Sequence, residues 1–90
     1  MVLRTVVVPN RLGIHARPAA QIVKLASTFQ CEISLKVGKD QVNAKSIMGV
    51  MTLAAAAGTF VSISASGPDE ENAVQAITEL FFEGFGEEMA

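Results

Sequence analysis

The sequence predicts an α+β fold in which helices cover one face of an antiparallel sheet. The predicted elements follow the order β-α-β-β-α-β-α along the chain. Two predicted strands, in residues 31–37 and 61–66, alternate apolar and polar residues, which indicates a sheet with one buried and one solvent-exposed face. A single layer of helices satisfies this pattern. The first β-α-β unit should be right-handed and split by an inserted strand.

The first three elements are a strand, a helix and a second strand. Residues 2–8 are mostly apolar and β-branched, which favours a strand that ends at Pro9 and Asn10. The helix is indicated by apolar residues at helical spacing and by Pro18, which a first helical turn tolerates. These apolar residues are Ala19, Ile22, Val23, Ala26 and Phe29. The apolar residues of the second strand are Cys31, Ile33, Leu35 and Val37.

The rest of the chain predicts a hairpin, a capped helix, a fourth strand and a last helix. A turn at residues 38–40 leads into a short strand with Val42 and Ala44, and Ser46 can cap a helix that runs towards Gly58. The acidic residues 69–71 are expected as caps and as the solvated start of the last helix, which Gly84 ends. The predicted core stripe of that helix is Ala73, Ile77, Leu80 and Phe81.

Length and composition predict one domain over residues 1–90, because half of the residues are apolar and no linker or repeat is visible. The net charge of -2 provides no excess of basic residues for binding nucleic acid. Cys31 is the single cysteine, which fits a reducing, cytoplasmic setting. The N-terminal residues do not match a signal peptide, and no apolar run is long enough to span a membrane. We expect a cytoplasmic monomer.

His15, the only histidine, lies in a loop just before a predicted helix. The N–H groups of Ala16 and Arg17 at that helix start favour an anion. A neutral imidazole nitrogen is a nucleophile near neutral pH, and the Arg17 guanidinium suits phosphoryl oxygens. These residues predict a phosphoryl-transfer site.

The residues alone leave other interpretations open. His15 can be a surface or capping residue, and the loop can bind a small anion or a regulator without covalent chemistry. Cys31 and His15 are too few for a zinc site, so we expect no metal and no cofactor. Gly84 and Gly86 are followed by no helix, which argues against a phosphate loop.

Two segments resemble the signatures of a known family. Residues 13–19, Gly-Ile-His-Ala-Arg-Pro-Ala, resemble the active-site signature of HPr, the histidine-containing phosphocarrier family of the bacterial phosphoenolpyruvate-dependent phosphotransferase system. Residues 45–51, Lys-Ser-Ile-Met-Gly-Val-Met, resemble its second signature. Element order and length also match. The resemblance implies an open-faced β-sandwich with strand order 1-4-2-3 and three helices on one face.

The resemblance also implies a function. His15 would accept a phosphoryl group at Nδ1 from phosphorylated enzyme I and pass it to a IIA domain for sugar uptake, with Arg17 steadying the group. The chain would then be a carrier and not a turnover enzyme. A nitrogen-related regulatory branch of the family is an alternative, which residues 80–85 favour, whereas the Ser46 segment favours the sugar branch.

Ser46 matches the position that a dedicated serine kinase modifies in part of the family, and it is also expected as a helix cap. Around it lies a predicted docking surface for partner proteins, which includes apolar residues that could alternatively be core. The docking residues are Ala20, Lys24, Ile47, Met48 and Met51.

Overall fold

Four antiparallel strands form the sheet that supports the fold. The computed structural model describes residues 1–90. The strands pair in the order β1-β4-β2-β3, as the resemblance implied. Their bounds are β1 Val2–Val7, β2 Glu32–Val37, β3 Asp40–Asn43 and β4 Phe60–Ser66. The helices are α1 Ala16–Ala26, α2 Ile47–Thr52, α3 Glu70–Phe82 and a short 3-10 helix, η1, Gly84–Gly86.

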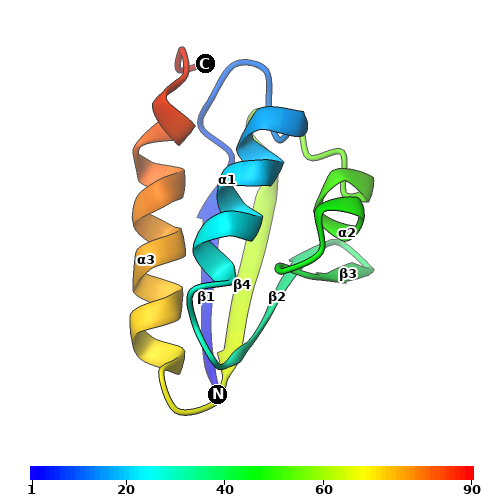
Figure 1. Ribbon diagram of the computed structural model, residues 1–90. Helices are drawn as coiled ribbons and strands as arrows, with labels where there is room; N and C mark the ends of the chain where they lie inside the picture. The colour runs from blue at the N-terminus through cyan, green and yellow to red at the C-terminus, as the bar shows by residue number, and fades with distance from the viewer.

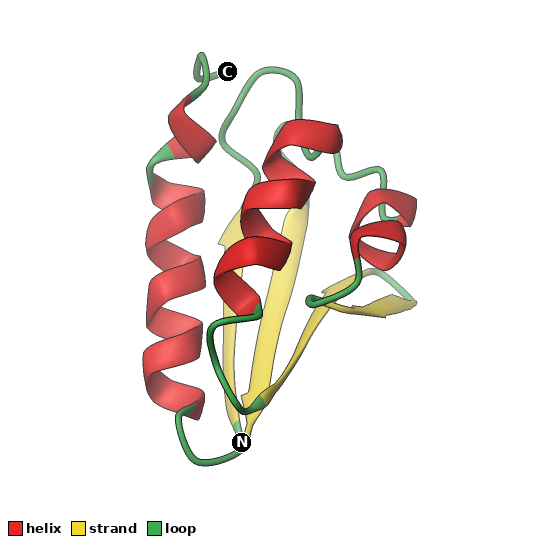
Figure 2. Cartoon of the chain, in the orientation of Figure 1, coloured by secondary structure: helices red, strands yellow, loops and turns green.

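The three α-helices lie in one layer on the same face of the sheet (Figures 1 and 2). Strand register explains why this face is buried. Leu35 of β2 is paired with Ile63 of β4, and both are fully buried, whereas the next pair along, Ser34 and Ser64, points to the uncovered face. Alternation along the strands therefore places the core between sheet and helices, and the predicted open-faced α+β sandwich is confirmed. No helix combines the length and the apolar character that a membrane span requires.

The helix that follows Ser46 is shorter than the sequence analysis predicted. The Ser46 hydroxyl accepts the Gly49 N–H at 3.1 Å, so the predicted cap is present. However, α2 ends at Thr52 and does not run towards Gly58. Ala54 adopts a positive φ of 48°, and the buried Ala55 turns its carbonyl towards the loop before α1. The positive φ of Ala54 ends the helical path, and the Ala55 carbonyl binds that loop and so accepts no hydrogen bond from a further helical turn.

Two details of the other helices also differ from expectation. Helix α1 ends at Ala26, so Phe29 packs against the core from outside the helix. Leu80 is only partly buried, and the core side of α3 also includes Val74 and Thr78. The predicted helical spacing of the buried residues was correct within each helix. The differences concern Phe29, which lies beyond the end of α1, and Leu80, which lies at the edge of the buried face of α3.

Asp69 does not cap its own helix, contrary to expectation. Its carboxylate accepts the backbone N–H groups of Gln30 and Cys31, each at 2.9 Å. The N–H of Gln30, with contributions from Cys31, lowers the pKa of Asp69 below its ordinary value. Asp69 therefore ties the start of α3 to the chain just before β2. Glu70 accepts the Gly67 N–H and pairs with the N-terminal ammonium group.

Gly13 allows the loop before α1 to lie directly against residues 55–56. Its φ is +71°, and a Cβ at this position would collide with the carbonyl oxygen of Ala55. The Ile14 N–H donates to that same oxygen at 2.8 Å. Because His15 follows immediately, this close backbone approach sets where the imidazole lies.

We expect Gly13→Ala to destabilise the fold more than Gly38→Ala does. Both glycines have positive φ, but a Cβ at Gly38 meets no atom within 4 Å. Gly38→Ala should cost about 1 kcal/mol from backbone strain alone. Gly13→Ala should cost at least ~2 kcal/mol, since the loop must also move away from Ala55. Urea denaturation of both variants measures the difference, and equal losses would contradict the proposed close approach.

Candidate functional site

His15 lies at the N-terminus of α1, at the end of a tightly held loop. It is the N-cap residue with extended backbone angles, and its side chain is 38% exposed. The loop is held by the Ile14 hydrogen bond to Ala55 and by the buried Asn10, whose Nδ2 donates to the Gly13 carbonyl at 2.8 Å. The predicted nucleophile is therefore accessible and sits on a fixed backbone.

The start of α1 presents free backbone donors beside His15. The N–H groups of Ala16 and Arg17 donate to no group of the chain, and Pro18 has no N–H. No acidic residue lies in the first turn of α1. Two free donors at the positive end of an 11-residue helix favour an anion at this point.

Glu87 is a site residue that the sequence analysis missed. Its Oε2 and Oε1 lie 2.8 Å and 3.0 Å from Nε2 of His15, and Oε2 lies 3.6 Å from Nη1 of Arg17. Asn10 donates a further hydrogen bond to Oε1 at 3.0 Å. The hydrogen bond from His15, together with that from Asn10, lowers the pKa of Glu87 below its ordinary value of 4.5. The carboxylate is therefore ionised near neutral pH.

A left-handed turn brings Glu87 back to His15. Gly84 and Gly86 have positive φ, and so does Phe85 between them, at 59°. Phe85 is buried with its ring edge-on to Phe81, at a centroid separation of 5.0 Å. Gly84 thus ends α3 as predicted, and η1 serves to reverse the chain.

Residues 87–90 then run alongside residues 9–11. Met89 forms an antiparallel bridge with Asn10, the Arg11 N–H donates to the Glu88 carbonyl at 2.8 Å, and the Ala90 N–H donates to the Pro9 carbonyl at 2.9 Å. Residues 87–90 show no alternation of apolar and polar residues that would predict this pairing. The two consecutive acidic residues at 87 and 88 are the only feature of the sequence that could have drawn attention to the segment. We call residues 87–90 the closing segment.

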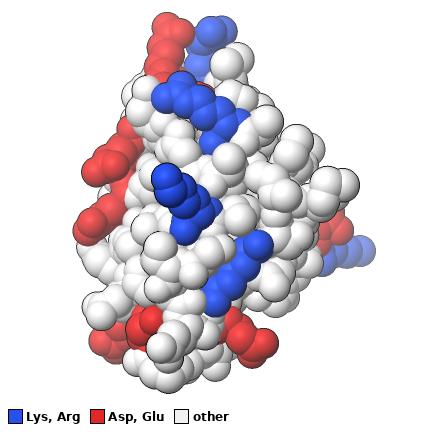
Figure 3. Space-filling model, in the orientation of Figure 1, with Lys and Arg blue, Asp and Glu red and all other residues white.

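Together these elements form an open depression of about 450 Å³. Its lining residues are Arg11, Leu12, His15, Arg17, Gly86, Glu87 and Glu88. Around the site, Figure 3 shows basic side chains over the middle of the helical face and acidic side chains along the α3 edge. No group of three or more His, Cys, Asp or Glu side chains is placed to hold a metal ion.

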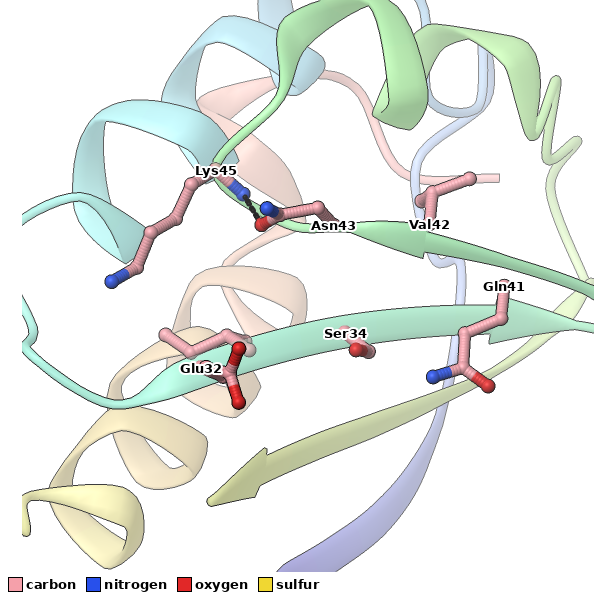
Figure 4. A pocket seen from close by; sticks show the side chains of 7 residues that line it. Glu32, Ser34, Gln41, Val42, Asn43 and Lys45 are labelled. Atoms are coloured by element: carbon pink, nitrogen blue, oxygen red, sulfur yellow. Dashed lines mark hydrogen bonds between the residues drawn. The ribbon is translucent and has the colours of Figure 1, made fainter. Parts of the chain in front are cut away.

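A second depression of about 460 Å³ lies over β2 and β3, away from these residues (Figure 4). It is lined mainly by polar side chains of the hairpin, among them Glu32, Gln41 and Asn43. The Lys45 ammonium group, which also lines it, donates to the Phe29 carbonyl at 2.7 Å. The depression holds none of the chemistry that the His15 loop provides, and we assign it no site.

The predicted docking residues are exposed. Ala20 and Lys24 lie on the solvent side of α1. On α2, Met48 is 72% exposed, Met51 43% and Ile47 39%, and only Val50 is buried. The alternative that these three residues belong to the core is therefore wrong. Helices α1 and α2 pack against each other, so the exposed residues belong to neighbouring helices (Figure 1).

Comparisons with known proteins agree with the geometry. Residues 2–83 match the family model described as "PTS HPr component phosphorylation site". The phosphocarrier protein HPr of Treponema pallidum is 52% identical over 98% of this chain and 100% of its own length. The crystal structure of HPr-C-His from Thermoanaerobacter tengcongensis superposes with a TM-score of 0.94, at 45% identity, over 98% of this chain and 99% of that one. An HPr dimer from the same organism gives a TM-score of 0.78 at 45% identity, over 97% and 100% of the two chains.

Proposed function

The chain belongs to the HPr family of phosphocarrier proteins, and we propose that it carries its phosphoryl group on His15. The observation that carries this proposal is the position of the half-exposed imidazole beside the two free N–H groups of Ala16 and Arg17. Phosphoryl transfer needs positioning and charge stabilisation more than covalent machinery. The helix start supplies positive potential, and the Arg17 guanidinium supplies a planar fork for the oxygens.

The proposed acceptor atom is Nδ1. Both oxygens of Glu87 engage Nε2, whereas Nδ1 makes no hydrogen bond within the chain. The attacking lone pair forms the Nδ1–P bond while the bond from phosphorus to the donor breaks, and the donor's leaving atom keeps that electron pair. The chain is a substrate and product of its partners and does not turn over a substrate by itself.

The proposed donor is phosphorylated enzyme I, and the proposed acceptors are IIA domains of sugar uptake. Both would dock on the exposed surface of Ala20, Lys24, Ile47, Met48 and Met51, because flexible methionines suit a surface that meets several partners. We propose that one chain suffices for each transfer and that the setting is cytoplasmic, where the free, buried Cys31 thiol stays reduced. Two of the apolar residues at positions 80–85, Phe81 and Phe85, are core residues, and their burial accounts for them without reference to the nitrogen-related branch.

We expect enzyme I and phosphoenolpyruvate to add one phosphoryl group to this chain, in an acid-labile linkage. A phosphoramidate on His15 hydrolyses in acid, whereas a serine ester survives. Intact mass before and after mild acid treatment measures both properties. His15→Ala should remain unmodified, and enzyme I-dependent phosphate on that variant would contradict the assignment. A non-covalent anion-binding domain would show no mass change in either protein.

We expect Arg17→Lys to slow phosphoryl transfer by roughly tenfold to a hundredfold, since lysine keeps the charge but loses the fork. Arg11→Lys is the matched control, because Arg11 lines the same depression and pairs with Glu88 at 2.9 Å. Rapid-quench kinetics from phosphorylated enzyme I measures the rate, and circular dichroism checks the fold. Equal rates for the two variants would show that Arg17 has no special role.

Ser46 is the proposed site of regulation by a serine kinase. It starts the helix that carries Met48 and Met51, so a charge at Ser46 would lie beside the docking surface. A partner would have to desolvate that charge or meet it with its own acids, and either costs affinity. The hydroxyl also caps α2, so the regulatory and structural roles share one atom.

We expect Ser46→Asp to weaken transfer from enzyme I and to leave the fold intact. An aspartate can cap the helix and is favoured by the helix dipole by ~0.3–1 kcal/mol, whereas Ser46→Ala loses the cap at a cost of about 1 kcal/mol. Ser46→Asp should therefore melt at or above Ser46→Ala while transferring more slowly, with partial recovery at high salt. Equal transfer by both variants would reduce Ser46 to a cap, and a joint loss of transfer and melting temperature would make the effect structural.

A further inference from the structure

Glu87 faces a single ring nitrogen of His15 with both of its carboxylate oxygens, at 2.8 Å and 3.0 Å. An ionised carboxylate can only accept hydrogen bonds. The nitrogen that it faces, Nε2, must therefore carry a proton. In a neutral imidazole the other nitrogen, Nδ1, then holds the lone pair.

The position of Glu87 is fixed by the same side chain that holds the His15 loop. Asn10 is fully buried, and its Nδ2 donates both to the Gly13 carbonyl and to Oε1 of Glu87. The orientation of this amide is unambiguous, because its oxygen would meet two acceptors if it were flipped. The carboxylate and the backbone before the imidazole thus share one anchor.

The backbone around Glu87 is also held. Phe85 is buried, and its carbonyl accepts a hydrogen bond from the Gln21 side chain of α1 at 3.1 Å. On the other side, the closing segment pairs with residues 9–11. The match to the family model ends at residue 83, before this segment begins, so nothing in that match assigns a role to Glu87.

We infer that Glu87 is a positioning residue that keeps the proton of His15 on Nε2 and so directs the phosphoryl group to Nδ1. The inference rests on the proposed function of His15. The negative carboxylate also stabilises the positive ring that forms when a neutral imidazole with a proton on Nε2 gains a substituent on Nδ1.

No proton has to move during the transfer. When the Nδ1–P bond forms, the ring becomes an imidazolium that bears hydrogen on Nε2 and phosphoryl on Nδ1, and the donor keeps the electrons of the broken bond. When the acceptor attacks phosphorus, the Nδ1–P bond breaks and its electron pair returns to Nδ1. The ring is neutral again, with the same proton facing Glu87 throughout.

The experiment combines a tautomer measurement with transfer kinetics in the full chain. Glu87→Gln keeps the shape of the side chain but can donate to the ring as well as accept from it. Glu88→Gln is the matched control, because Glu88 lies in the same closing segment and pairs with Arg11 at 2.9 Å instead of with His15. Long-range ¹H–¹⁵N NMR correlations of ¹⁵N-labelled protein report which ring nitrogen carries the proton.

We expect the neutral ring to show the Nε2–H tautomer alone, both in the unmodified chain and in Glu88→Gln. Glu87→Gln should show both tautomers, a transfer rate lower by about tenfold, and some phosphoryl group on Nε2 after reaction. A merely structural role for Glu87 would leave the tautomer and the site of phosphorylation unchanged.

Two results would overturn the inference. One is a Glu87→Gln variant that keeps the Nε2–H tautomer alone and transfers at the unmodified rate. The other is faster transfer in Glu87→Gln, which would show that the carboxylate opposes the incoming phosphoryl group by charge repulsion. The tautomer is measured without phosphate, so it tests Glu87 even if enzyme I fails to modify His15, which would overturn the proposed function separately.

Discussion

One-sided burial of the sheet determines where every other part of this chain can lie. The central strand β4 buries Val61, Ile63 and Ala65 on one face and turns serines to the other, so only one face can accept helices. Three helices must then share one layer, and α1 and α2 become neighbours. The proposed acceptor His15 at the start of α1 and the exposed methionines of α2 are thus carried by adjacent helices on the same face of the molecule.

The sequence predicted what depends on local patterns. Alternation in β2 and β4 predicted the strands and their buried face, and the position of Ser46 before an apolar run predicted its cap. The short spacing of His15 and Arg17 predicted that both lie at one helix start, and they do; the role of His15 as phosphoryl acceptor stays a prediction. Each of these signals is read over a few neighbouring residues, where spacing and chemistry are visible together.

What the sequence could not predict depends on polar contacts between distant segments. Asp69 binds backbone 38–39 residues away, and Glu87 reaches a histidine 72 residues before it. Acidic residues near a helix start or a chain end are usually solvated, so nothing local distinguishes these two. The early end of α2 has the same origin, because Ala55 is committed to Ile14 on another segment. Single polar contacts of this kind do not recur at a regular spacing along the chain, so the sequence pattern does not predict them.

The left-handed turn at η1 has a consequence for how this protein tolerates change in length. Segments that follow the last helix of a domain are ordinarily where trimming, insertion and drift are absorbed most easily. Here a left-handed turn, with positive φ at residues 84–86, joins two anchored residues. Phe81 is anchored in the core, and Glu87 is anchored on His15. Adding or removing one residue between them would break one anchor or the other. The number of residues in this stretch is therefore as constrained as in a loop inside the domain. Proteolytic cleavage there would alter the site while leaving the sheet and helices in place.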